Sequence, residues 1–153
     1  MSRAAKLLVV DDDASVVDYL LEMLGEDGHQ AVGTTSPLDA LEWIAKHEFD
    51  LVIADVEMPE LRGLDLMAKI HAHRPGQLVL LVTAFGSIDL AVKAVRAGAC
   101  DFVTKPFRWE ALQVAIERAL RERRMRREIV RLRAELREQR DGELVARSPA
   151  MRR

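Results

Sequence analysis

Residues Leu7 to Asp13 read LLVVDDD, so that four apolar residues run directly into three carboxylates. A short, continuously apolar run is typical of a strand that is buried on both faces. Neighbouring carboxylates raise one another's pKa unless a cation lies between them. The stretch therefore predicts a core strand that delivers an acidic cluster to a cation-binding site.

Apolar runs of similar length recur at residues 51–54 and 78–82, and weaker ones occur at 30–34 and 100–104. Between these runs, apolar residues return every three or four positions, which is the spacing of amphipathic helices. Strands that alternate with helices in this way predict an α/β fold. We therefore expect a five-stranded parallel sheet, doubly wound, with helices on both of its faces.

Several helix boundaries can be predicted from capping residues. Ser36 precedes a proline and is expected to cap the helix that follows, and Ser87 is expected to cap a helix that begins at Ile88. Gly25 and Gly28 are expected to end the first helix, because glycine readily adopts the backbone conformations that stop a helix.

The composition describes one domain with a core and a short appendage. The chain has 153 residues, of which 49% are hydrophobic and 31% charged. Its single cysteine, Cys100, has no partner in the chain for a disulfide, which favours a reducing environment. The first apolar run is too short for a signal peptide or a membrane span. We expect a soluble, cytoplasmic protein without membrane association.

The last helical pattern is unusually long, because it runs from about Arg108 to Arg140 without glycine or proline. Within residues 121–140, nine arginines and four glutamates surround an apolar series at intervals of four, three and four residues: Met125, Ile129, Leu132 and Leu136. This heptad spacing favours a dimeric coiled coil. The alternative is a solvated helix held by Glu/Arg pairs. The basic run lacks a helix-turn-helix, so we expect no direct DNA binding.

Polar residues that end the apolar runs are expected to meet at one edge of the sheet. In doubly wound sheets, ligands bind beyond the carboxyl ends of the strands. The strand-end residues are Asp11, Asp12 and Asp13, then Asp55, Thr83 and Lys105. Carboxylates suit Mg²⁺, and a lysine beside a hydroxyl suits phosphoryl oxygens. Asp55 is then a candidate nucleophile, because carboxylates can form aspartyl phosphates.

Six motifs carry a resemblance to a known family: VVDDD at 9–13, ADVEMP at 54–59, LRGLDL at 61–66, VTA at 82–84, AGACDF at 97–102 and TKPF at 104–107. In this order and spacing, they resemble the receiver domain of bacterial two-component response regulators, which has a flavodoxin-like fold. The resemblance covers residues 6 to about 120. It implies a phosphoacceptor signalling domain, not an enzyme, with slow autophosphorylation from small donors and slow autodephosphorylation.

The resemblance also implies roles for particular residues. Asp55 would accept a phosphoryl group from the phosphohistidine of a sensor histidine kinase. Asp11, Asp12, Asp55 and the backbone carbonyl of Glu57 would bind Mg²⁺. Asp13, just beyond the paired acids, is expected to cap a helix.

Further positions of the resemblance concern phosphoryl binding and switching. Thr83, Ala84 and Lys105 would contact the phosphoryl group. Movement of Thr83 would let the aromatic side chain of Phe102 rotate inward. Phe102 stands where many relatives carry tyrosine, so only the packing half of that switch is expected. The Lys105–Pro106 peptide bond would be cis.

The stretch DGELVARSPAMR at 141–152 is expected to break the long helix. It resembles the opening of the AAA+ ATPase domain of NtrC-type sigma-54-dependent transcription activators, with Ala146 where glycine is usual. This implies three parts: a receiver at 1–120, a dimeric linker at 121–140 and the start of a truncated ATPase domain at 141–153. DNA-binding domains would lie in the full-length chain. The chain has no Walker A loop, so it should not hydrolyse ATP by itself.

Three other interpretations remain open. A stand-alone receiver would signal by docking to a target protein, with the last residues as a flexible end. Asp11 and Asp13 after a strand are similar to the nucleophile motif of haloacid-dehalogenase-like phosphatases, although the later paired acids of that family are missing. A dinucleotide-binding Rossmann domain would need a glycine fingerprint after the first strand, which this chain lacks.

Overall fold

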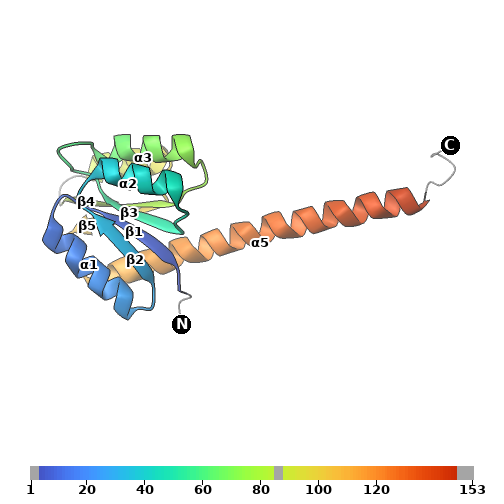
Figure 1. Ribbon diagram of the computed structural model, residues 1–153, viewed down its shortest axis with the longest axis horizontal. Coiled ribbons are helices and arrows are strands. Elements are labelled where there is room, and N and C mark those ends of the chain that lie inside the picture. Colours follow the sequence, from blue (N-terminus) through green and yellow to red (C-terminus); the bar gives the residue numbers. More distant parts are fainter. Residues whose placement is uncertain (1–3, 85–87, 148–153) are drawn as a thin grey trace. The chain divides into compact units, whose positions relative to one another are not determined.

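The structure, a computed structural model, describes residues 4–84 and 88–147. Within these ranges, strands and helices alternate along the chain (Figure 1). The elements in order are β1 (Lys6–Val10), α1 (Ala14–Glu26), β2 (Gln30–Thr34), α2 (Pro37–Lys46), β3 (Leu51–Asp55), α3 (Gly63–His73), β4 (Val79–Ala84), α4 (Ile88–Arg96), β5 (Asp101–Lys105) and α5 (Trp109–Arg147).

The five strands form one parallel sheet in the order β2-β1-β3-β4-β5. Each predicted strand is present and is shifted by at most two residues at either end. From β1 the chain first adds β2 on one side, and it then adds β3, β4 and β5 on the other side. The strand order therefore reverses between β1 and β3. The predicted five-stranded, doubly wound parallel sheet is therefore confirmed.

Successive residues of each central strand serve opposite faces of the sheet, as the strand geometry requires. In β1, Leu8 and Val10 join the core under α2, α3 and α4, whereas Leu7 and Val9 join the core under α1 and the first part of α5. Figure 1 shows α2 and α3 on one side of the sheet and α1 on the other. Because both faces are covered, the central strands read as unbroken apolar runs.

The helix starts and ends follow the predicted capping residues only in part. Ser36 caps α2, and its hydroxyl accepts a hydrogen bond from the Asp39 N–H at 3.2 Å. The prediction for Gly25 was wrong, because α1 continues to Glu26. The chain turns at Gly28, whose φ of +90° is a conformation that glycine adopts without strain. Ser87 lies outside the described residues.

The chain divides into two compact units, Met1–Leu120 and Arg121–Arg153. α5 contributes to both, and it continues to Arg147 without the predicted break at Asp141 and Gly142. That prediction was wrong, since one glycine in a helix interior costs only about 1 kcal/mol relative to alanine. None of the helices in the described ranges is long and apolar enough to cross a membrane.

Candidate functional site

Three aspartates converge at the carboxyl edge of the sheet. Val10 and Ala54 are register partners on adjacent strands, so the next residues, Asp11 and Asp55, emerge side by side. Carboxylate oxygens of Asp11, Asp12 and Asp55 all lie within 4.8 Å of one another. Asp11 and Asp55 are buried, with 3% and 6% of their surface exposed, whereas Asp12 is open to solvent.

Lys105 connects the two buried acids. Its Nζ donates to Asp11 Oδ2 at 2.9 Å and to Asp55 Oδ2 at 3.3 Å. These contacts join residues that are 94 and 50 positions apart in the chain. An amine placed between two buried carboxylates offsets their mutual repulsion, and it lies where an incoming anionic group would meet the acids.

The second oxygen of each buried acid is held by the backbone. The Asp13 N–H donates to Asp11 Oδ1 at 2.9 Å, and the Glu57 N–H donates to Asp55 Oδ1 at 3.1 Å. Each carboxylate therefore accepts a hydrogen bond from a backbone N–H on one oxygen and from Lys105 on the other. This arrangement fixes both carboxyl groups before any ligand binds. The predicted contribution of the Glu57 carbonyl stays a prediction.

The pKa values of Asp55 and Lys105 are both raised. Burial raises the pKa of Asp55, and the Asp11 charge adds to this, against the opposing effects of the Glu57 N–H and of Lys105. For Lys105, burial alone would lower the pKa, but the hydrogen bond and charge of Asp11, together with Asp55, raise it. The lysine therefore stays a cation at neutral pH and keeps its role between the acids.

Asp13 lies outside this cluster and caps α1. Its carboxylate accepts hydrogen bonds from the Ser15 N–H at 3.0 Å and from the Ser15 hydroxyl at 2.6 Å. These two bonds lower the pKa of Asp13. A capping carboxylate is thus separated from the metal-binding candidates although it follows them directly in the sequence.

Thr83 and Phe102 lie on the same face of the sheet. Thr83 is fully buried in β4, and its hydroxyl has no hydrogen-bond partner among the described residues. Leu81 and Phe102 are register partners, and both pack in the core under α2, α3 and α4. Since side chains two residues apart share a face, Thr83 and Phe102 are diagonal neighbours there. Ala84 follows as the last, half-buried residue of β4.

Lys105 is followed by a cis peptide bond to Pro106. Both residues line a shallow cavity beside the acidic cluster, together with Ala84 and Phe107 and with three residues of α1: Ser15, Val16 and Tyr19. The Lys105 side chain is 28% exposed, so its amine can be reached from solvent while it holds the acids. The site is therefore open on the side that α1 and the residues after β5 form.

Gly63 is a positioning residue, although the sequence motif that contains it assigns it no role. A Cβ at this position would lie 2.5 Å from the Asp55 carbonyl oxygen and 2.7 Å from Val56 Cα. The Gly63 N–H also donates to the Val56 carbonyl at 2.8 Å. The start of α3 therefore rests directly on the backbone of Asp55. Its place in the LRGLDL motif was the available signal, but only the contact explains it.

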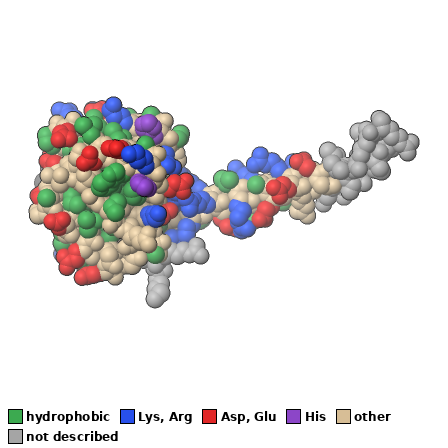
Figure 2. Space-filling view, viewed as in Figure 1, with side chains coloured by type: hydrophobic (Ala, Val, Ile, Leu, Met, Phe, Trp, Pro, Cys, Tyr) green, Lys and Arg blue, Asp and Glu red, His purple; other side chains and the backbone are tan. Residues whose placement is uncertain are grey.

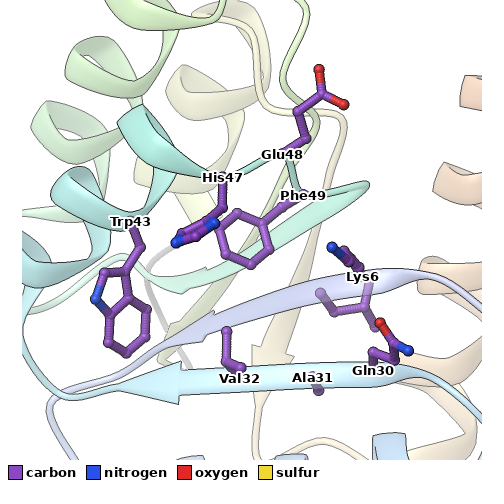
Figure 3. A pocket seen from close by; sticks show the side chains of 9 residues that line it. Lys6, Gln30, Ala31, Val32, Trp43, His47, Glu48 and Phe49 are labelled. Atoms are coloured by element: carbon purple, nitrogen blue, oxygen red, sulfur yellow. The ribbon is translucent and has the colours of Figure 1, made fainter.

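A second hollow lies at the opposite end of the strands (Figure 3). Its volume is about 440 Å³, and Trp43, Phe49 and Val32 provide much of its apolar wall. Lys6 and Gln30, the first residues of β1 and β2, line it, whereas the acids follow the last residues of the strands. This hollow is therefore separate from the acidic cluster.

The residues present fit a hard divalent cation. Three carboxylate oxygens within 4.8 Å of one another supply the oxygen ligands that Mg²⁺ prefers, and the exposed Asp12 leaves room for water. Histidine and cysteine are absent from this group, which argues against a zinc centre here.

The fold and this site agree with a family match. Residues 7–117 match the response regulator receiver domain, and the chain belongs to that family. Receiver domains are the phosphoacceptor signalling domains of two-component systems, generally bind Mg²⁺ at an acidic pocket and typically interact with histidine kinases. The match removes the haloacid-dehalogenase-like and dinucleotide-binding interpretations.

Known relatives are regulators of transcription and response regulators. The chain is 38% identical over 124 residues to the phosphoglycerate transport system transcriptional regulatory protein PgtA of Salmonella typhimurium, covering 81% of this chain and 30% of PgtA. It is 43% identical over 109 residues to the response regulator protein FleR of Pseudomonas aeruginosa, covering 71% of this chain and 23% of FleR. The chain thus matches less than a third of each relative's length.

A solved structure shows the same fold over most of the chain. The crystal structure of NtrX from Brucella abortus in complex with ADP superimposes with a TM-score of 0.82 and 34% sequence identity. The similarity covers 85% of this chain and 30% of the NtrX chain.

Proposed function

We propose that Asp55 accepts a phosphoryl group from the phosphohistidine of a sensor histidine kinase in a Mg²⁺-dependent reaction. The observation that carries this proposal is the position of Lys105, whose amine bridges Asp55 and Asp11 within a cluster of three carboxylates. A nucleophilic carboxylate, a set of cation ligands and a phosphoryl-binding amine meet there.

Asp11, Asp12, Asp55 and the backbone carbonyl of Glu57 would hold the cation. Bound Mg²⁺ would neutralise the acids and the phosphoryl oxygens, so that the two anionic groups can approach each other. The backbone N–H groups of Asp13 and Glu57 hold Asp11 and Asp55 in place without taking up both of their oxygens.

In the transfer step, a carboxylate oxygen of Asp55 forms a bond to phosphorus while the phosphorus–nitrogen bond of the donor breaks. The electron pair of that bond leaves with the imidazole of the kinase. With acetyl phosphate as donor, a phosphorus–oxygen bond breaks instead, and acetate leaves. Lys105 can keep its bond to Asp11 while its amine turns toward the new phosphoryl oxygens.

The buried hydroxyl of Thr83 supports a switch. It has no hydrogen-bond partner among the described residues. Leaving a buried polar atom unpaired costs free energy, and an arriving acceptor would remove that cost. A phosphoryl group on Asp55 brings strong acceptor oxygens. We expect Thr83 and the backbone of Ala84 to bind them, and Phe102, which lies on the same face as Thr83, to repack in response.

The attached output would be a transcription-activating AAA+ ATPase, with DNA-binding domains further along a full-length chain. The resemblance of residues 141–152 to the start of such a domain supports this. The matched relatives include a transcriptional regulatory protein, and the similar NtrX was solved with ADP. Dimerisation through the apolar series in α5 would transmit the state of Asp55. A stand-alone receiver is the alternative.

The first test is the intact mass of the protein after incubation with acetyl phosphate and Mg²⁺. We expect one phosphoryl adduct, absent in Asp55→Asn and absent when EDTA replaces Mg²⁺. Asp18→Asn, a change of an exposed aspartate on α1, serves as the matched control and should keep the adduct. An adduct that persists in Asp55→Asn would refute the assignment of the phosphoacceptor.

The second test concerns the output. We expect sedimentation velocity and small-angle scattering to show a dimer whose scattering curve changes with beryllofluoride, a phosphoryl mimic. A monomer that accepts the phosphoryl group normally would favour the stand-alone receiver. Identical curves of a dimer with and without beryllofluoride would contradict control through the linker.

A further inference from the structure

The apolar series that was predicted for a coiled coil in α5 has only one heptad assignment. Met125, Ile129, Leu132 and Leu136 are 59%, 46%, 44% and 60% exposed. In the heptad abcdefg, the step from a to d is three residues and the step from d to the next a is four. The only three-residue step runs from Ile129 to Leu132. Ile129 and Leu136 are therefore a positions, and Met125 and Leu132 are d positions.

Once the heptad is assigned, the charged residues beside the apolar series show a regular pattern. The g position precedes each a, and the e position follows each d. Glu128 and Glu135 occupy the g positions, whereas Arg133 and Arg140 occupy the e positions. From residue 128 onward, acid and base are thus sorted to opposite flanks of the apolar series, although the helix surface shows both signs of charge (Figure 2).

This sorting selects one orientation of two helices. In a parallel, in-register pair, a g residue approaches the e residue five positions further along the partner. Glu128 then meets Arg133 of the second copy, and Glu135 meets Arg140 of the second copy. In an antiparallel pair, g flanks g and e flanks e, so glutamates would face glutamates and arginines would face arginines. Only the parallel pair has opposite charges on both flanks.

Arg131 holds both glutamates in the single helix. Its guanidinium donates to Glu128, and its Nη1 donates to Glu135 Oε1 at 3.1 Å. The hydrogen bond from Arg131 lowers the pKa of Glu128, so this carboxylate stays charged. The two g-position carboxylates are thus held on one flank of the apolar series, one turn before and one turn after Arg131.

The heptad that contains Met125 has the opposite charge pattern. Its g and e positions are Arg121 and Arg126, and its a position is Glu122. In a parallel pair, Arg121 would approach Arg126 of the second copy with like charge, and the a position would bring two carboxylates together. Pairing is therefore favoured from Met125 onward and opposed before it.

We propose that two copies of this chain pair through a parallel, in-register coiled coil that starts at Met125 and whose orientation is set by Glu128 with Arg133 and Glu135 with Arg140 across the dimer. This inference rests on the dimer of the proposed function and adds its orientation, its register and its starting point. The paired stretch is short, about two heptads, so the dimer should depend strongly on protein concentration and on salt.

Charge reversal on the whole 153-residue chain tests the pairing. One variant carries Glu128→Arg and Glu135→Arg, and the other carries Arg133→Glu and Arg140→Glu. Each should raise the dimer dissociation constant by at least about tenfold at low salt, and mixing the two should restore dimers. The matched control is Arg124→Glu with Arg137→Glu, which makes the same change of charge at c and b positions and should weaken the dimer far less.

A cysteine scan tests orientation and register. In a Cys100→Ala background, Leu132→Cys at a d position should form an intermolecular disulfide rapidly under mild oxidation, because parallel in-register helices place the two residues opposite each other. Val130→Cys at a b position is the control and should cross-link slowly. An antiparallel pair would place Leu132 opposite an a-position residue, and the difference between the two cysteines would vanish.

The outcomes separate this inference from the proposed function. Rapid cross-linking of Leu132→Cys with recovery of dimers on mixing supports it. A dimer that ignores the charge reversals, or in which Leu132→Cys does not cross-link, overturns it and leaves the dimer of the proposed function intact. A monomer at every concentration, with and without beryllofluoride, overturns both. Phosphorylation of Asp55 is read by mass on the same samples and fails or succeeds independently.

Discussion

Lys105 neutralises a pair of carboxylates that the fold buries at the end of two adjacent strands. Its amine is the cation that an acidic cluster of this kind requires, and it is supplied by the last strand of the sheet. Lys105 and a bound divalent ion would therefore both offset the negative charge of Asp11 and Asp55. This overlap leads to a prediction about stability.

Replacing Lys105 by methionine should lower the free energy of unfolding by about 1 to 3 kcal/mol in EDTA, because two buried carboxylates lose a charged hydrogen-bond donor. Mg²⁺ should recover more stability in the variant than it adds to the original protein. Urea denaturation with and without Mg²⁺ measures both effects. Lys46→Met removes an exposed pair with Glu42 and should change stability by less than about 1 kcal/mol. Equal losses in the two variants would contradict the prediction.

Asp55 should make stability depend on pH. Its pKa is raised by burial, so the folded state holds this proton more tightly than the unfolded state does. The charged carboxylate therefore lowers stability above the raised pKa, and this penalty disappears as the pH falls through it. In EDTA, Asp55→Asn should be more stable than the original protein near neutral pH, and the difference should shrink toward acidic pH. Denaturation midpoints measured across this range, with Asp18→Asn as control, test the sign.

Gly63 should be as sensitive as any core residue although it carries no side chain. A methyl group there would meet backbone atoms of Asp55 and Val56, which cannot move aside as a flexible side chain can. Gly63→Ala should cost about 1 to 3 kcal/mol and should slow phosphorylation, since α3 must shift away from Asp55. Gly25→Ala is the matched control, because nothing lies within 4 Å of its Cβ and it occupies a helix. That change should leave stability equal or slightly higher.

At the scale of elements, α1 depends on the capping carboxylate that directly follows the buried acids. Asp13→Ala should destabilise the protein, whereas Asp13→Asn should keep much of the cap, because asparagine also accepts a hydrogen bond from the helix N–H groups. The lowered pKa means that the advantage of aspartate over asparagine is present above its unfolded pKa and fades as the pH falls through its folded pKa. Thermal denaturation at several pH values checks this order.

Neither substitution of Asp13 should prevent Mg²⁺-dependent phosphorylation of Asp55. This readout separates a cap from a metal ligand, since the cluster of close carboxylates contains Asp11, Asp12 and Asp55. Loss of the phosphoryl adduct in Asp13→Asn would show that the cap carboxylate also serves the site.

The predictability of the elements follows from where their side chains lie. Strands β1, β3 and β4 could be located closely because burial on both faces demands an unbroken apolar run. The edge strands β2 and β5 are half-buried, and their patterns were correspondingly weaker. The end of α5 was predicted too early. The residues on both sides of Gly142 are helical, and the helix continues through this glycine. A lone glycine is too small a penalty to decide a boundary.

At the scale of the whole molecule, the two units should be separable. The buried residues of α5 lie between Leu112 and Leu120, within the first unit. A chain ending at Arg124 should therefore keep its denaturation midpoint and its phosphorylation rate but should no longer dimerise. A chain ending at Ala111 loses Leu112 and Ile116 from the core and should unfold. Sedimentation, denaturation and intact mass on the same preparations test this.

The candidate site could be predicted in outline because a doubly wound parallel sheet brings the ends of its strands to one edge. Asp11, Asp55 and Lys105 were expected there, and they make contact. The backbone N–H groups that hold the acids, and the approach of Gly63 to Asp55, depend on the course of loops, for which local sequence carries no comparable rule. Only the folded chain brings them into place.

The position of Lys105 on the last strand has a consequence for biosynthesis. β1 and β3 supply Asp11 and Asp55 early, but the amine that stabilises this pair is the ninety-fourth residue after Asp11. During synthesis on the ribosome, the two acids lack this amine until β5 has emerged and joined the edge of the sheet. A nascent chain should therefore be a poor phosphoryl acceptor until its sheet is complete, so that only fully folded receivers report a signal.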